Sequence, residues 1–178
     1  MAVVQRIKKD LGPVEKMSRA LITEVLTLAA THYWAHKRYS CHVELGVEAW
    51  GKRRIDLMAM NTKGLLIGME VKSCVADYRT DLKWRNYLPY VNKMYMVFSE
   101  SLFNNKKFMA KAGPELKEEG VGVMVLCERT GHVYVAKNAK KTEVTPEVQH
   151  AMLLRMAWRG GASKRTMPRR KRMYLANY

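Results

Sequence analysis

Residues 54–72 read RIDLMAMNTKGLLIGMEVK, and this stretch decides the fold that we expect. Two runs of apolar residues flank the sequence Asn-Thr-Lys-Gly at positions 61–64, whose Asn and Gly suit a tight reversal of the chain. The stretch therefore predicts a β-hairpin with apolar strands. Three charged residues, Asp56, Glu70 and Lys72, interrupt these strands, and a purely structural hairpin would have no use for them.

The charged residues of the hairpin are expected to meet on the sheet. Because side chains alternate along a strand, Glu70 and Lys72 should share one face, and Asp56 should point away from Ile55 and Leu57. A short reversal would then bring Asp56 close to Glu70. Two such carboxylates repel each other and lose hydration, and a divalent cation removes that cost. We therefore expect Asp56 and Glu70 to hold Mg²⁺ or Mn²⁺, with Lys72 aimed at what the metal binds.

The remaining apolar pattern predicts helices and strands around this hairpin. Helices are expected at 14–37, 74–88 and 145–158, and strands at 41–47, 55–60, 65–72, 93–99, 121–127 and 132–136. Residues 106–119 are expected to be loop with a short helical piece. The chain is too short for two ordinary domains. The prediction is one α/β (α+β) domain at 1–160, with a mixed central sheet flanked by helices, and a basic tail at 161–178.

Asp56, Glu70 and Lys72 resemble the signature of the PD-(D/E)XK nuclease superfamily, with Ile55 where the motif's name has proline. The stretch VKSCVADYRTDLKWRNYLPYVNKMYMVF at 71–98 resembles the corresponding run of the MmcB-like family of proposed DNA-repair endonucleases. The matching positions are Glu70, Lys72, Ser73, Asp77, Tyr78, Asp81, Lys83, Trp84 and Tyr87. The resemblance extends from Glu44 to about Val135 and implies a restriction-endonuclease-like αβββαβ core.

The chemistry of the side chains and this resemblance together indicate the residues of the site. Catalysis is assigned to Asp56, Glu70, Lys72 and Glu44, and metal binding to Asp56, Glu70 and the carbonyl of Val71. Glu24 and Glu15 in the first helix are the alternatives to Glu44. Contacts with DNA are expected from Ser73, Lys83 and Arg85, and support of the site from Asp77, Asp81, Trp84 and Tyr87. For Asp81, a first-turn acid that merely favours the helix dipole is an equal alternative.

Two histidines one helical turn apart, His32 and His36, have the spacing of metal ligands. The sequence offers no evident third ligand, so a pair at the edge of the core or facing DNA is the favoured interpretation. The three cysteines form no CxxC pair, which argues against zinc and suits a reducing compartment.

The balance of charge points to a polyanion as partner. The chain has 32 Lys and Arg against 16 Asp and Glu, a formal net charge of +16. No acidic residue follows Glu147, so the excess concentrates at the C-terminal end. The tail residues predicted to bind DNA phosphates are Arg165, Arg169, Arg170, Lys171 and Arg172. A solvated tail or a membrane-surface patch is the alternative, and we favour nucleic acid because so strong an asymmetry is typical of its partners.

No apolar run approaches the roughly 20 residues that span a bilayer, and the N-terminus lacks the apolar stretch of a secretory signal. We expect a cytoplasmic protein of a bacterial or bacteriophage-infected cell. The predicted function is a Mg²⁺-dependent or Mn²⁺-dependent deoxyribonuclease in DNA repair, recombination or phage DNA processing. The alternatives are a catalytically silent DNA-binding or recruitment module and an RNA-binding accessory protein. Many relatives in the superfamily dimerise, so a homodimer is a further expectation.

Overall fold

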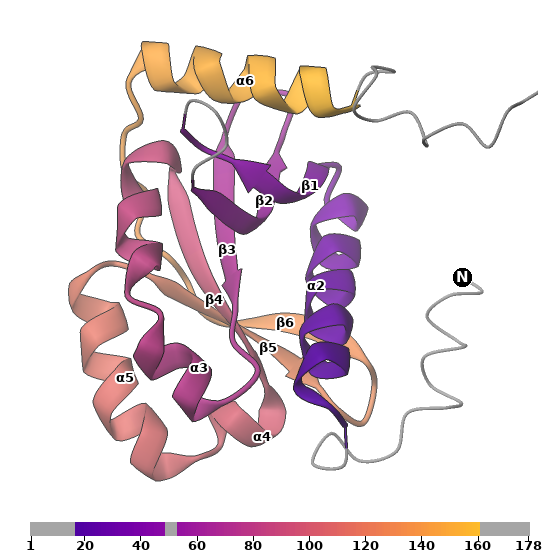
Figure 1. Ribbon diagram of the computed structural model, residues 1–178, viewed down its shortest axis with the longest axis vertical. Helices are drawn as coiled ribbons and strands as arrows, with labels where there is room; N and C mark the ends of the chain where they lie inside the picture. The colour runs from indigo at the N-terminus through magenta and orange to yellow at the C-terminus, as the bar shows by residue number, and fades with distance from the viewer. Residues whose placement is uncertain (1–16, 49–52, 161–178) are drawn as a thin grey trace, which may run out of the picture.

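The structure is a computed structural model that describes residues 17–48 and 53–160 (Figure 1). The helices are α2 (Arg19–His36), α3 (Val75–Thr80), a 3₁₀ helix (Lys83–Tyr90), α4 (Glu100–Phe103), α5 (Lys106–Glu118) and α6 (Pro146–Gly160). The strands are β1 (Ser40–Gly46), β2 (Arg54–Met60), β3 (Leu66–Val71), β4 (Lys93–Ser99), β5 (Gly122–Cys127) and β6 (His132–Lys137).

The strands form one six-stranded sheet in the order β1-β2-β3-β4-β5-β6. Pairing is antiparallel from β1 to β3, parallel from β3 through β4 to β5, and antiparallel again between β5 and β6. The sheet is therefore mixed, as predicted. The succession α2, β1, β2, β3, α3, β4 is the αβββαβ order that the resemblance implies.

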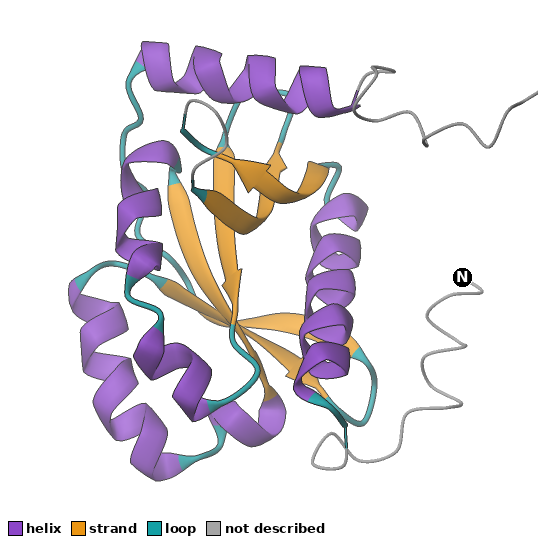
Figure 2. Ribbon diagram, in the orientation of Figure 1, coloured by secondary structure: helices purple, strands orange, loops and turns teal. Residues whose placement is uncertain are grey.

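Helices cover both faces of the sheet, which gives an α/β architecture with three layers (Figure 2). Helix α2 buries Leu26, Ala30 and Trp34 in one hydrophobic cluster with strand residues such as Leu57 and Met69. The second cluster lies on the opposite face and joins strand residues to α3, the 3₁₀ helix, α5 and α6 through Tyr78, Trp84, Phe108, Leu116 and Met156. Both faces of the hairpin strands are consequently buried.

The simple alternation expected in β2 was wrong at one point. Ile55 packs in the cluster that includes Trp84, whereas Leu57 packs in the cluster under α2. The regular pairing of β2 with β3 ends at Leu57 and Met69, while β2 stays paired with β1 through Ile55 and Leu45. The alternation breaks at Asp56, which lies between these pairs and opposite Glu44, a residue with a left-handed φ of 54°.

The helix predicted at 74–88 is not continuous. It divides into α3 and the 3₁₀ helix, and between them Asp81 adopts an extended conformation with φ −100° and ψ 94°. The side chain of Asp81 accepts a hydrogen bond from the amide of Lys83 at 2.9 Å, a local bond that competes with helical pairing. Helical spacing therefore does not continue from Asp77 beyond Asp81 to Trp84.

Two other helices differ from their predicted bounds. Within the described residues, α2 begins at Arg19 because Ser18 caps it, its hydroxyl accepting from the amide of Leu21 at 3.2 Å. The predicted start of this helix at residue 14 lies outside the described residues. At 106–119, where loop with a short helical piece was predicted, the chain forms the continuous helix α5. It holds despite Pro114 because Asn105 caps it and one face buries Phe108 and Leu116.

Candidate active site

The backbone pairing of β2 with β3 ends just before the charged residues. Hydrogen bonds from backbone amides to the carboxylates of Asp56 and Glu70 connect the two strands there. The amide of Asp56 donates to Glu70 Oε1 at 3.3 Å, and the amide of Val71 donates to Asp56 Oδ2 at 2.8 Å. Strand β3 meanwhile remains bound to β4, because the amide of Lys72 donates to the carbonyl of Val97 at 3.1 Å. Backbone amides of two strands thus fix the Asp56 and Glu70 carboxylates beside each other.

Lys72 completes this cluster from the end of β3. Its ammonium lies 3.2 Å from Glu70 Oε2 and 2.6 Å from Asp81 Oδ2. The side chains of Lys72 and Glu70 are each only 3 % exposed, whereas that of Asp81 is 27 % exposed. The structure therefore brings together Asp56, Glu70, Lys72 and Asp81 in one group that is buried on one side and open at Asp81.

The electrostatics of the group reflect crowded carboxylates with little water. Burial raises the pKa of Glu70 to about 8, and the neighbouring charge of Asp56 adds to the rise. Burial also raises the pKa of Asp56, against the lowering effect of the Val71 amide. For Lys72, burial lowers the pKa, but the negative charges of Glu70 and Asp81 outweigh it and hold the pKa above its usual value. The single ammonium of Lys72 therefore does not neutralise the three carboxylates of Asp56, Glu70 and Asp81.

Among the candidate further acids, Glu44 is the one placed to act on the pair. Its negative charge raises the pKa of Asp56, and its Oε2 lies 3.6 Å from Arg54 Nε. Glu44 has a φ of 54°, the left-handed region that a residue with a side chain seldom adopts. Glu24 is exposed on α2 and is not among the charges that shift the pKa of Asp56 or Glu70. Glu15 lies outside the described residues.

Helix α6 holds the strand that carries Glu44, a connection the sequence analysis missed. Arg159 Nη1 donates to the carbonyl of Glu44 at 2.7 Å, and Arg155 Nη1 donates to the carbonyl of Glu48 at 2.6 Å. Figure 1 shows α6 lying across the end of the sheet next to β1. Contacts between positions more than 100 residues apart leave no local pattern, so no signal in the sequence pointed to them.

Asp77 and Ser73 bond to each other rather than to the cluster. The amide and hydroxyl of Ser73 donate to Asp77 Oδ2 at 2.9 and 3.0 Å, which ties the end of β3 to the first turn of α3. Trp84 is 1 % and Tyr87 5 % exposed, and the hydroxyl of Tyr87 donates to the carbonyl of Arg54 at 2.8 Å. These residues support the strands around the cluster through packing and backbone bonds.

The predicted DNA contacts differ in their surroundings. Lys83 is exposed. Arg85 stacks over Trp84 and forms ion pairs with Glu115 and Glu119, the latter at 3.0 Å from Nε. The charge of Arg85 is therefore largely balanced within the protein, which weakens the case for its contact with phosphates. The predicted tail contacts at 165–172 lie outside the described residues.

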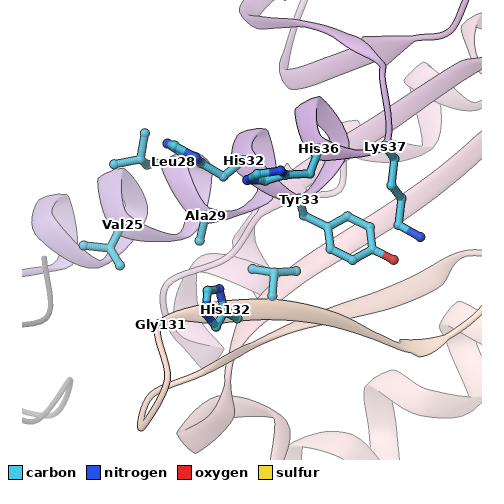
Figure 3. Close-up of a pocket in the computed structure, with 10 residues that line it drawn as sticks. Val25, Leu28, Ala29, His32, Tyr33, His36, Lys37, Gly131 and His132 are labelled. Carbon is cyan, nitrogen blue, oxygen red and sulfur yellow. The ribbon is translucent and has the colours of Figure 1, made fainter. Parts of the chain in front are cut away.

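The two histidines of α2 line a pocket of about 330 Å³ together with His132 (Figure 3). The pocket lies between α2 and the turn that precedes β6, and its walls are mostly apolar, including Val25, Leu28 and Val133. None of the residues of the acidic cluster lines it. His32 and His36 therefore line a pocket that is separate from the cluster of carboxylates.

The acidic cluster fits a divalent cation in its chemistry. Over residues 17–48 and 53–160, no three or more His, Cys, Asp or Glu residues group closely enough to form a complete metal cage. Mg²⁺ does not need one, because one or two carboxylates with waters and phosphate oxygens are its usual ligands in proteins. A buried carboxylate and a half-buried one lie side by side here, and burial together with the charge of Asp56 raises the pKa of Glu70 to about 8, so the pair is such a set.

An αβββαβ core with an acidic pair and a lysine where two strands diverge is the arrangement expected of a PD-(D/E)XK nuclease-like protein. The chain belongs to the MmcB-like family: residues 15–168 match the family described as DNA repair protein MmcB-like. The resemblance to this family expected from the sequence is thereby confirmed.

Two solved structures are similar to the chain at low sequence identity. The SPO1766 protein of unknown function from Silicibacter pomeroyi superposes with a TM-score of 0.60 at 17 % identity, over 84 % of this chain and 86 % of that one. SfsA of Pyrococcus furiosus in complex with Ca²⁺ gives a TM-score of 0.38 at 16 % identity, over 70 % of this chain and 65 % of that one. No curated protein sequence matches the chain. None of the helices in the described ranges has the length and hydrophobicity that crossing a membrane requires.

Proposed function

We propose that the protein is a metal-dependent deoxyribonuclease that hydrolyses phosphodiester bonds during DNA repair. The observation that carries this proposal is the mutual fixation of Asp56 and Glu70 by backbone amides, with the Lys72 ammonium 3.2 Å from Glu70. Membership of a DNA-repair family and the net charge of +16 support DNA as the substrate.

Asp56, Glu70 and the carbonyl of Val71 are the groups that would hold Mg²⁺ or Mn²⁺. When bound, such an ion supplies an activated water and neutralises charge on the phosphate. The burial of Glu70 and Lys72 excludes bulk water, which strengthens the attraction of the Lys72 ammonium for a phosphate. The Lys72 ammonium, whose pKa is held high, stays charged and donates hydrogen bonds to the phosphoryl oxygens rather than acting as a base. Glu44 is the outer acid that would orient a water beside Asp56.

Cleavage by purified protein on a panel of DNA structures tests the proposal. Single-stranded, duplex, nicked and branched DNA would each be incubated with Mg²⁺, with Mn²⁺ and with EDTA. Metal-dependent products are expected, and the Asp56→Asn and Lys72→Met variants should lose at least about 100-fold in rate, the order that a positioned charge contributes. Glu118→Gln, which removes an exposed acid of α5, is the matched control and should cleave normally.

A second function keeps the same fold as a DNA-binding module without turnover. It is favoured by one observation, that the Lys72 ammonium already pairs with Glu70 and Asp81 and so partly satisfies the acids without metal. DNA binding without cleavage on every substrate and with either metal would support this module and overturn the nuclease.

A further inference from the structure

The break between α3 and the 3₁₀ helix turns Asp81 back onto Lys72. Asp81 Oδ2 lies 2.6 Å from the ammonium, whereas Glu70 Oε2 lies 3.2 Å away. The shorter of the two ion pairs is thus the one with Asp81, which lies outside strands β2 and β3. In a continuous helix the backbone at Asp81 would be helical, and the extended conformation seen there would be absent.

The position of Asp81 is built by its own chain segment. Its amide donates to the carbonyl of Asp77, and its second oxygen, Oδ1, accepts from the amide of Lys83 at 2.9 Å. Asp77 is in turn bound by the amide and hydroxyl of Ser73, the residue after Lys72. Residues 72–83 therefore close on themselves, with the Lys72–Asp81 ion pair as the closing contact. A carboxylate held at both oxygens is set in place before any ligand arrives.

The charge of the group leaves a place for one divalent cation. Three carboxylates, Asp56, Glu70 and Asp81, surround one ammonium, so the group carries a net charge of −2 when all are ionised. Glu70 faces both the Asp56 amide and the Lys72 ammonium, so an ammonium that moved fully onto Glu70 would compete with a cation for the same carboxylate.

We propose that Asp81 is a positioning residue that draws the Lys72 ammonium away from Glu70 and so keeps the Glu70 carboxylate open to a divalent cation. This inference rests on the proposed metal site. In this role Asp81 does not itself contact the cation. Without Asp81, Lys72 pairs with Glu70 alone, and the cation must displace it. Loss of Asp81 therefore weakens metal binding through Lys72.

A double-mutant cycle on the full chain tests this. Mn²⁺ binding without DNA would be measured by calorimetry for the wild type, Asp81→Asn, Lys72→Met and the double variant. Asp81→Asn should weaken Mn²⁺ binding about 10- to 100-fold, the range for residues that orient metal ligands. In the Lys72→Met background the same change should weaken it less than about threefold, because no ammonium remains to compete. Glu118→Gln, at an exposed acid of α5, is the matched control for charge and should bind as the wild type does.

Each outcome decides between the roles. An equal loss in both backgrounds would show that Asp81 acts by its charge alone and would overturn the positioning role, as would an unchanged affinity in Asp81→Asn. Absence of Mn²⁺ binding in the wild type would overturn this role and the metal site together. Mn²⁺ binding with the expected coupling, but without DNA cleavage, would sustain the role and overturn the nuclease. Asp81→Ser keeps an oxygen for the Lys83 amide and serves as a second variant, with circular dichroism to check folding.

Discussion

The carboxylate of Glu70 accepts the backbone amide of Asp56 at 3.3 Å, although the two residues are 14 positions apart and lie on different strands. A glutamate that replaces a rung of the sheet ladder is buried by necessity, and burial raises its pKa to about 8. In the metal-free protein the native state therefore holds a proton on Glu70 between about pH 4.5 and pH 8, while the unfolded chain has released it.

The first prediction concerns this proton. Because the native state binds more protons than the unfolded state in that window, the free energy of unfolding should fall as pH rises, by at most roughly 1.4 kcal/mol per unit for one group. The pKa of Asp81 is lowered, so its stabilising effect is complete above its ordinary value of 3.8 and adds no slope in the window. Glu70→Gln should flatten the dependence, as measured by urea unfolding with EDTA from pH 5 to pH 8.

Glu118→Gln removes an exposed acid and should retain the wild-type slope. Parallel profiles for the wild type and Glu70→Gln would mean that Glu70 is ionised throughout, and the assigned electrostatics of the cluster would be wrong.

The second prediction contrasts two glycines. A Cβ on Gly122 would lie 2.5 Å from ring atoms of Tyr95 and 2.6 Å from the amide nitrogen of Ala139, so Gly122→Ala should destabilise the protein by about 1–3 kcal/mol. A Cβ on Gly113 in α5 would meet its nearest neighbour beyond the adjacent residues only at 3.8 Å, but the ring of Pro114 disfavours a Cβ on the preceding helical residue. Gly113→Ala should therefore change stability much less than Gly122→Ala, by less than about 1 kcal/mol. Urea unfolding measures both changes, and an equal loss of stability for the two substitutions would contradict the packing described.

The third prediction concerns Asn92, a buried side chain that joins β3 to the segment before α6. Its Oδ1 accepts from the amide of Leu66 at 2.9 Å, and its Nδ2 donates to the carbonyl of Thr142 at 3.0 Å. Asn92→Ala leaves both backbone groups unpaired and should destabilise by about 2–4 kcal/mol in urea unfolding. Asn92→Asp keeps the acceptor, loses the donor and buries a charge, so it should not restore stability. Wild-type stability in either variant would show that water replaces these bonds.

Periodicity in the sequence was enough for most elements of the fold. The two apolar runs on either side of residues 61–64 placed the hairpin correctly, and Pro146 marked the first residue of α6. The predictions that were wrong concern places where a side chain binds a group outside its own helix or strand. The helix breaks at Asp81 because its carboxylate binds the Lys72 ammonium and the Lys83 amide, and neither bond follows from helical spacing.

The site shows the same division. Asp56, Glu70 and Lys72 were found because their spacing is local to one hairpin and matches a known signature. The contact of Arg159 with the backbone of Glu44 was missed because it spans 115 positions and uses a carbonyl, which every residue has. The left-handed φ of Glu44 was equally invisible, since glycine is the usual sign of that conformation.

The last prediction concerns the tail at 161–178, which carries Lys164, Arg165, Arg169, Arg170, Lys171 and Arg172 and no acidic residue. Deleting it should weaken DNA binding and reduce the slope of log K against log salt by up to about 5, because each phosphate neutralised contributes about 0.9 to that slope. Replacing the six basic residues by glutamine at full length should have the same effect if charge alone is responsible. Fluorescence anisotropy from 50 to 300 mM salt measures both, with the Asp56→Asn background preventing cleavage. A deletion that leaves affinity and slope unchanged would assign the tail to solubility or to a protein partner.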